Sequence, residues 1–294
     1  MWFIFALAVS WFQAFYYVGN QNSRLQPGVF IVYRGFLAAI AVIPLLLFCT
    51  HDFLWKFYAL VIAQGLAISF VDLKYFHAFK KFGAETVCTI KPLTVLLTFG
   101  LWLIIKPYML TRYLDTPLRS LVIISAIVAI VYATAKYREC SVGFKCFTQV
   151  FPLLLISSLI DTSNKLVMEY SNGHLMAASI WRVFITGIII GCVNLWIARQ
   201  HHIKMKTIIK WSNIKRGLFI LLLVMSMITV NFSLYYADNP AYTSAVIYLS
   251  VVWIMLINKL QNRFGRKKVY KKIAKKWIFT LLIATIILIL ATSK

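Results

Sequence analysis

Acidic residues are scarce in this sequence, and the motifs of several enzyme classes are missing. The chain contains only eight Asp and Glu among 294 residues. These acids are scattered, without a DxxD pair, whereas membrane enzymes acting on diphosphate or lipid-linked substrates need clustered carboxylates for Mg²⁺. There is also no Gly-x-Ser-x-Gly elbow, no HExxH zinc motif and no GxxxxGK[ST] phosphate loop. We therefore expect neither an enzyme nor an ATP-driven pump.

Cysteine and histidine are also few. The five cysteines form no CxxC motif, and the five histidines lie in connections or near a helix end, without partners at metal-ligand spacing. We expect no disulfide framework, no metal site and no cofactor.

Apolar residues dominate what remains. Hydrophobic residues make up 61% of the chain and charged residues 13%, whereas soluble domains carry roughly 25% charged residues. Aromatic residues reach 16%, and Trp and Tyr recur near the ends of apolar runs, as expected at lipid headgroup level. The composition predicts an all-α integral membrane protein.

The apolar runs predict about ten membrane-spanning helices, since each crossing needs roughly 20 residues. Several connections are very short, so neighbouring helices should form antiparallel hairpins. The first run lacks the basic segment of a secretory signal, and we expect it to remain in the mature protein. The predicted spans cover residues 2–19, 28–50, 54–79, 84–105, 119–136, 147–168, 175–198, 217–237, 241–258 and 277–292.

An internal repeat divides the chain into two halves, residues 1–140 and 141–294. A shift of about 148 residues lays VYRGF on IWRVF and superposes Arg34 on Arg182. A shift of about 159 residues superposes Asp72 on Asn231. Each half holds five spans, an odd number, so the second half enters the membrane from the opposite face. Inverted five-helix repeats are typical of secondary transporters.

Three stretches carry a family resemblance: PGVFIVYRGFLAAIAVIPLLLF, FGAETVCTIKPLTVLLTFGLWLI and LISSLIDTSNKLVMEY. Through them the chain resembles the EamA-like ten-helix carriers of the drug/metabolite transporter superfamily. It departs from that family at Val251, where a proline is usual, and in the loop KPYMLTRYL. The resemblance implies a central cavity faced by residues 147–168, and candidate solutes such as amino acids or nucleotide-like metabolites. Small multidrug carriers of this superfamily use an acidic residue in the first helix, and its absence here argues against cation/proton antiport of that type.

Charges within the predicted spans form two groups. A charge near the bilayer centre costs a few kcal/mol or more and normally faces a cavity or a partner. Each end of the bundle would hold both positive and negative side chains. A carrier needs this arrangement if one group of ion pairs closes while the other opens. Alternatively, Arg34, Lys165 and Arg182 snorkel to the headgroups. The predicted gating or ion-pair residues are Arg34, Asp72 and Glu85 near one face, together with Lys91, and Asp161, Lys165 and Arg182 near the other.

Lys91 is the best single candidate for binding an anionic group of a substrate. It precedes Pro92, which should kink the helix and release backbone groups. The alternative is an internal pair of Lys91 with Glu85 or Asp72. Asp161, Asn164 and Lys165 share one side of a helix, because they are spaced i, i+3 and i+4. Further candidates for substrate binding are Gln13, Tyr17, Asn164, Asn231, Tyr235, Ser244 and Tyr248.

The net charge of +23 lies mostly in connections between apolar runs. Residues 199–216 hold six Lys or Arg and residues 259–276 hold nine. The positive-inside bias places these loops in the cytoplasm and both termini outside, whereas relatives in the superfamily commonly keep both termini inside. We expect contact with anionic lipids and no nucleic-acid partner, in a multi-pass protein of a bacterial inner membrane.

These observations favour a secondary transporter that moves a small zwitterionic or anionic metabolite by alternating access. The coupling ion is not specified by the sequence. The main alternative is a noncatalytic scaffold or assembly subunit, and a membrane enzyme ranks below it.

Overall fold

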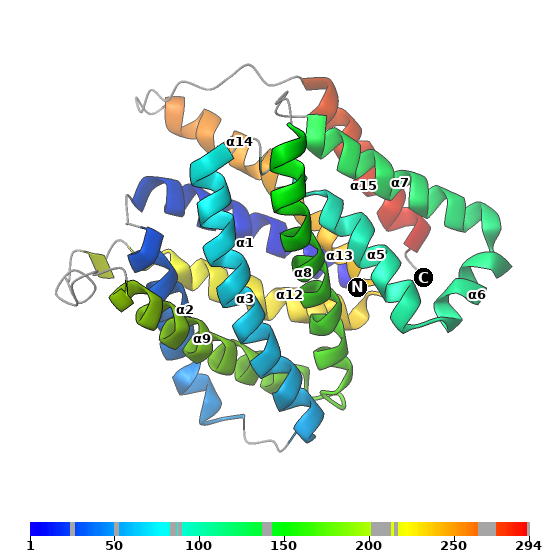
Figure 1. Cartoon of the computed structure of the whole chain (residues 1–294). Helices are drawn as coiled ribbons and strands as arrows, with labels where there is room; N and C mark the ends of the chain where they lie inside the picture. The colour runs from blue at the N-terminus through cyan, green and yellow to red at the C-terminus, as the bar shows by residue number, and fades with distance from the viewer. Residues whose placement is uncertain are drawn as a thin grey trace.

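A computed structural model describes residues 1–23, 27–49, 53–82, 87, 90–136, 143–200, 213–214, 217–263 and 275–292. These residues form helices joined by turns, with no strand among them (Figure 1). The helices are α1 (Trp2–Ser23), α2 (Pro27–Leu46), α3 (Trp55–Phe82), α5 (Leu93–Ile105), α6 (Tyr108–Asp115), α7 (Pro117–Lys136), α8 (Phe144–Glu169), α9 (Leu175–Gln200), α12 (Ile220–Tyr236), α13 (Pro240–Ile247), α14 (Ser250–Arg263) and α15 (Lys275–Thr292).

Seven helical stretches in the described residues are long and apolar enough to cross a membrane. α5 and α6 would add an eighth span together, although they meet at a bend of 107°. α12 and the apolar part of α15 are shorter. The chain is therefore a multi-pass, all-helical membrane protein, and the number of ten spans stays a prediction. The seven stretches are Trp2–Gly19, Val29–Leu46, Trp55–Tyr75, Pro117–Lys136, Phe144–Glu169, Leu175–Gln200 and Pro240–Ile257.

Two predicted spans differ from continuous helices. In the span predicted at 84–105, Lys91 and Pro92 form a turn before α5, because Pro92 has no N–H to donate. In the span predicted at 241–258, a turn at Tyr248 and Leu249 separates α13 from α14. The predicted loop after Ile105 contains α6, whose chain direction turns away from that of α5 at Lys106 and Pro107.

Local sequence explains several helix ends. Asn239 caps α13, since its side-chain oxygen accepts a hydrogen bond from the backbone nitrogen of Ala241 at 3.0 Å, and Pro240 occupies the first turn. Between α8 and α9, Asn172 and Gly173 both adopt positive φ, of 48° and 88°. Asn and Gly are the residues that tolerate this conformation, so they allow the tight hairpin between the two helices.

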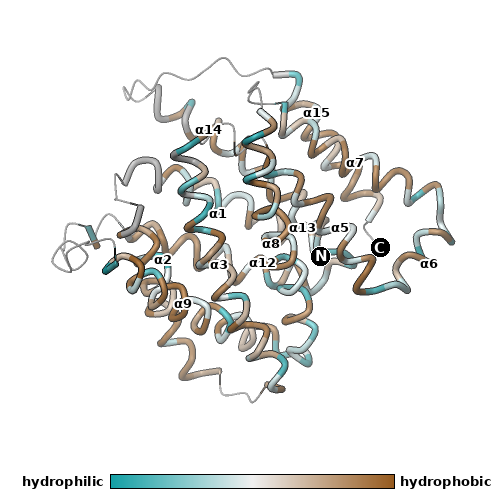
Figure 2. Tube along the Cα trace, viewed as in Figure 1, coloured by the Kyte–Doolittle hydropathy of each residue, from teal (hydrophilic) through white to brown (hydrophobic). Residues whose placement is uncertain are grey.

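α2 and α9 cross with their backbones in close contact, as Figure 1 shows on the side opposite α7. A Cβ atom added at Gly35 would lie 2.2 Å from the backbone nitrogen of Gly191 and 2.7 Å from the carbonyl oxygen of Gly187. Only glycine fits at this position, and the lack of side chains at Gly35, Gly187 and Gly191 lets the two helix backbones approach closely. Both helices are predominantly hydrophobic along their length (Figure 2).

α3 and α12 pack against this crossing, and the remaining helices extend the bundle away from it. α1 packs on α12, and α3 packs on α8. α7 and α15 lie side by side at one edge of the bundle, with α6 at their end (Figure 1). One hydrophobic cluster joins residues of α1, α5, α7, α13 and α15, and another joins α2, α9 and α12. Each cluster joins helices from residues 1–140 to helices from residues 141–294, so the polar side chains between the clusters also lie between the two parts of the chain.

Candidate functional site

A buried arginine lies at the meeting point of four helices. Arg182 of α9 donates from Nε to Oε1 of Gln64 on α3, over 3.0 Å. Its Nη1 donates to Oδ1 of Asn231 on α12 over 2.8 Å, and its Nη2 to Oδ1 of Asn164 on α8 over 2.5 Å. Arg182 is 3% exposed and Asn231 is 0% exposed. We call Arg182, Gln64, Asn164 and Asn231 the Arg182 centre.

The guanidinium in this centre is bound by neutral groups. All three acceptors are amide oxygens, and no carboxylate in the described part of the chain lies within ion-pair distance of Arg182. Asp161 is the acid whose charge acts on it from further away. In addition, Nδ2 of Asn231 is buried and has no hydrogen-bond partner among the described residues. A buried donor without a partner costs about 1–3 kcal/mol, and a buried charge more.

The repeat-related residues in the first half form an ion pair. Nη1 of Arg34 on α2 contacts Oδ2 of Asp72 on α3. Arg34 and Asp72 are the residues that the two sequence shifts superpose on Arg182 and Asn231. Both pairs are in direct contact in the fold, one as an ion pair and the other as a hydrogen bond from a cation to a neutral amide. The two halves thus share a contact and differ in its charge.

The two interrupted helices are tied to each other. The hydroxyl of Tyr248, at the turn between α13 and α14, donates to the carbonyl oxygen of Lys91 over 3.1 Å. The hydroxyl of Thr94 donates to the same carbonyl oxygen over 2.8 Å. The same oxygen also accepts from the backbone nitrogen of Thr94 over 3.0 Å, so this turn brings two side-chain hydroxyls and one backbone N–H to one carbonyl group. Ser158 of α8 also donates to a nearby backbone oxygen, that of Thr94, over 3.2 Å.

Asp161 lies between these features. Its Oδ2 accepts a hydrogen bond from Ser244 of α13 over 3.1 Å. The Nζ atom of Lys91 lies 5.9 Å from the ring centroid of Tyr75, within cation–π range. Among the described contacts, Asp161 is therefore bound by a hydroxyl group and not by a cation.

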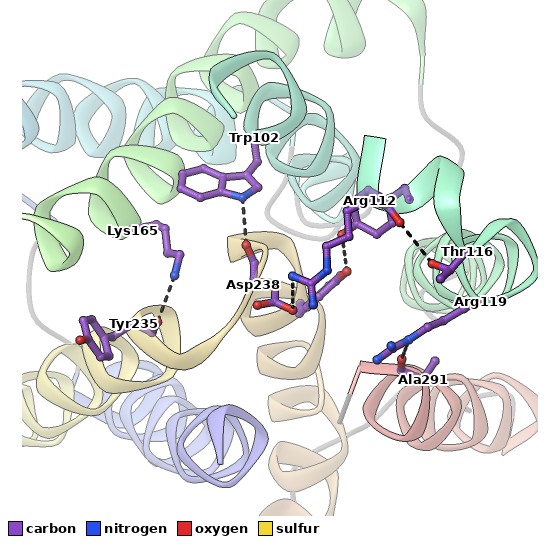
Figure 3. A network of polar contacts seen from close by, with 10 residues as sticks. Trp102, Arg112, Thr116, Arg119, Lys165, Tyr235, Asp238 and Ala291 are labelled. Carbon is purple, nitrogen blue, oxygen red and sulfur yellow. Dashed lines mark hydrogen bonds and ion pairs between the residues drawn. The ribbon is translucent and has the colours of Figure 1, made fainter. Parts of the chain in front are cut away.

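A second polar network lies where the α12–α13 connection meets α5, α6 and α8 (Figure 3). Trp102 donates from Nε1 to the carbonyl oxygen of Asp238 over 2.9 Å, while Arg112 pairs with the carboxylate of Asp238 over 3.4 Å. Lys165 donates to the carbonyl oxygen of Tyr235 over 3.0 Å. We call these residues the terminal-end network, because the C-terminal end of α15 is nearby, where Arg119 donates to the carbonyl oxygen of Ala291 over 2.6 Å.

The alternative that Arg182 and Lys165 snorkel to the headgroups does not fit their positions in the fold. Both side chains are buried among protein groups, Lys165 at 7% side-chain exposure. Arg34 is paired with Asp72. Asp161 and Lys165, both candidates for gating or ion pairs, do not pair with each other among the described contacts. The short Asp161 side chain faces α13, whereas the longer Lys165 side chain lies towards Glu169, with 4.0 Å between Nζ and Oε1.

The remaining predicted residues are more dispersed. Gln13 is half-buried in α1, and Tyr17 is 39% exposed. Tyr235 contributes its backbone oxygen to Lys165, and its ring packs on Tyr236. Glu85 lies outside the described residues. Gln64 was not predicted, although a polar residue in the middle of the apolar run VIAQGLAISF is a signal for an interior partner.

A scan with protein-family models and a search of curated proteins gave no match to this chain.

Proposed function

We propose that this protein is a secondary transporter that moves a small polar metabolite by alternating access. The observation that carries the proposal is the correspondence between Arg34–Asp72 and Arg182–Asn231. Residues superposed by an internal sequence repeat make equivalent contacts, inside an apolar bundle where such groups are expensive to bury. Internal repeats that meet at central polar groups are the architecture by which secondary transporters alternate access.

Helix packing supports two inverted repeats, residues 1–140 and 141–294, with ten spans in total. If each helix is replaced by its counterpart in the other half, the packed pair α1 and α12 becomes α8 and α3, and these two helices also pack together. By the same replacement, the packed pair α5 and α8 becomes α13–α14 and α1. The interrupted helix α13–α14 does pack on α1. The packed pairs α2–α9 and α7–α15 are unchanged by the replacement, because the two helices of each pair are counterparts of one another. This pattern fits the resemblance to EamA-like drug/metabolite carriers.

The polar contacts suggest how access would alternate. The terminal-end network ties α6 and α8 to the α12–α13 connection, and in this proposal these contacts close that end of the bundle. Arg34 and Asp72 sit nearer the other end, as judged from their positions in α2 and α3. When the halves rock, one set of contacts would break as the other forms. Arg182 has the same position in α9 that Arg34 has in α2, so in the inverted repeat it would lie correspondingly near the first end.

Transport by purified protein in liposomes tests this function. Liposomes with the protein would be loaded with an unlabelled solute, and counterflow of the labelled solute would be measured for amino acids, organic acids and nucleotide-like metabolites. We expect saturable counterflow for at least one class, above that of protein-free liposomes. A scaffold would give the protein-free rate for every solute, and that result would overturn the proposal.

A further inference from the structure

The Arg182 centre carries an unbalanced positive charge. Each guanidinium has five N–H donors, and three of those of Arg182 go to the amide oxygens of Gln64, Asn231 and Asn164. One N–H on each Nη atom is not used in these three contacts. A guanidinium can bind a carboxylate in a bidentate geometry through one N–H from each of two nitrogens. The protein's own acid in this region, Asp161, is hydrogen-bonded to Ser244 instead.

Asn231 supplies a third unused donor. Its Oδ1 accepts from Arg182, whereas its Nδ2 is fully buried without a partner among the described residues. A buried amide group is normally satisfied, so an unpaired donor beside a cation indicates an acceptor that binds there. Three donors and one charge suit a monoanionic carboxylate. A phosphate dianion would leave an uncompensated negative charge in the same place.

The first half of the chain shows what a neutralised version of this centre looks like. Arg34 is in contact with the carboxylate of Asp72, whereas the repeat-related Arg182 is in contact with the amide of Asn231. Asp and Asn differ by one oxygen and one nitrogen. In the second half, therefore, the chain keeps the arginine and omits the carboxylate that would neutralise it.

We infer that Arg182 and Asn231 bind the carboxylate group of the transported solute. This inference rests on the proposed function and specifies its substrate class as small organic carboxylates. The bound carboxylate supplies the negative charge that Asp72 supplies to Arg34. Arg182 and Asn231 are 3% and 0% exposed, so the solute reaches them when the helices separate.

The variant Asn231→Asp provides the sharpest test, because it adds the missing carboxylate with almost no change in shape. It should fold at least as stably as wild type, since it repeats the Arg34–Asp72 pair. Gln64→Glu is a second variant, placing a carboxylate at the Nε atom of the same guanidinium. Gln149→Glu is the matched control. Gln149 is also an amide that accepts from a cation, Lys81, over 3.1 Å, but the contact is exposed.

Binding would be measured in detergent as the shift of the thermal unfolding temperature. The probes are amino acids and mono- and dicarboxylic acids, each with its matched primary amide. For wild type and Gln149→Glu we expect stabilisation by at least one carboxylate and not by its amide. In Asn231→Asp the affinity should fall at least about tenfold, since an internal carboxylate occupies the same donors. Gln64→Glu should also bind more weakly.

The outcomes separate this inference from the proposed function. If a carboxylate and its amide bind equally, or if both Asn231→Asp and Gln64→Glu bind as wild type, the carboxylate site is overturned. Counterflow in liposomes would then still support a carrier. If wild type binds no probe and gives no counterflow, the proposed function fails with it.

Discussion

Arg182 donates a hydrogen bond to Asn231 over 2.8 Å, in the place where the other half of the chain has an ion pair. The two sequence shifts superpose Arg182 on Arg34 and Asn231 on Asp72. The contact between Arg182 and Asn231 joins α9 to α12 and leaves the positive charge of Arg182 buried beside a neutral amide.

Arg34 and Asp72 should act as one unit. Arg34→Gln and Asp72→Asn should each lower the transport rate, because either change leaves a charged group without its partner in a largely apolar bundle. The double variant should lose less than the two single losses combined, with a coupling free energy of about 0.5–3 kcal/mol. Additive losses in a double-mutant cycle of transport rates would show that the two residues act separately.

Replacing Lys91 by Gln should abolish transport without unfolding the protein. The contacts of Tyr248 and Thr94 are to the backbone oxygen of Lys91, so they persist when the side chain changes. Thermal unfolding and counterflow would be measured on the same preparation. Tyr248→Phe is the complementary variant, since it removes one hydrogen bond to that oxygen and keeps the charge. Near-normal counterflow in Lys91→Gln would remove Lys91 from the site.

The crossing of α2 and α9 should not tolerate a single methyl group. Gly35→Ala places a Cβ atom 2.2 Å from the backbone of Gly191, and overpacking of this kind typically costs about 1–3 kcal/mol. Gly100→Ala is the matched control in α5, because nothing lies within 4 Å of its Cβ position. It should be neutral or stabilising by up to about 1 kcal/mol, as expected for Gly→Ala in a helix. Equal unfolding temperatures for the two variants would contradict the observed packing.

Locking the terminal-end network should stop transport. Cysteines introduced by Arg112→Cys and Asp238→Cys, in a chain whose native cysteines are replaced by serine, would be joined with a short bis-maleimide. This link holds α6 against the α12–α13 connection. The control link joins Tyr132→Cys to Lys136→Cys, one turn apart on the exposed side of α7, so it does not tie the two halves together. Inhibition by the control link alone, or by neither link, would show that this end does not open.

Charge in the connections predicts the orientation of the chain. The basic residues of 199–216 and 259–276 should lie in the cytoplasm and both termini outside. Single cysteines at positions 267 and 293 would be tested with an impermeant maleimide in intact cells, again without native cysteines. Both positions lie outside the described residues, so this prediction rests on sequence. Labelling at position 267 and not at position 293 would show that the predicted orientation is wrong.

Much of the helical arrangement could be predicted from the sequence. Long apolar runs have one solution in lipid, because every backbone polar group must be satisfied within the helix. The repeat offsets also superposed Arg34 on Arg182 and Asp72 on Asn231, and in the fold Arg34 contacts Asp72 while Arg182 contacts Asn231. Pro92 indicated the turn before α5.

Other features left weaker signals. The turn at Tyr248 and Leu249 contains neither Pro nor Gly, and it depends on tertiary contacts such as the one between Tyr248 and Lys91. Asp161 and Lys165 have helical spacing that brings them to one side, but their different side-chain lengths and neighbouring helices direct them to different partners. Spacing along one helix cannot specify which other helix packs there.

The charge of Arg182 also determines how the membrane potential would act on a carrier of this kind. With a carboxylate bound, the Arg182 centre is neutral, so its reorientation moves little net charge across the membrane. The empty carrier keeps one positive charge there. Moving an elementary charge through the full field changes the energy by about 2.3 kcal/mol per 100 mV. Voltage would therefore act mainly on the return of the unloaded protein.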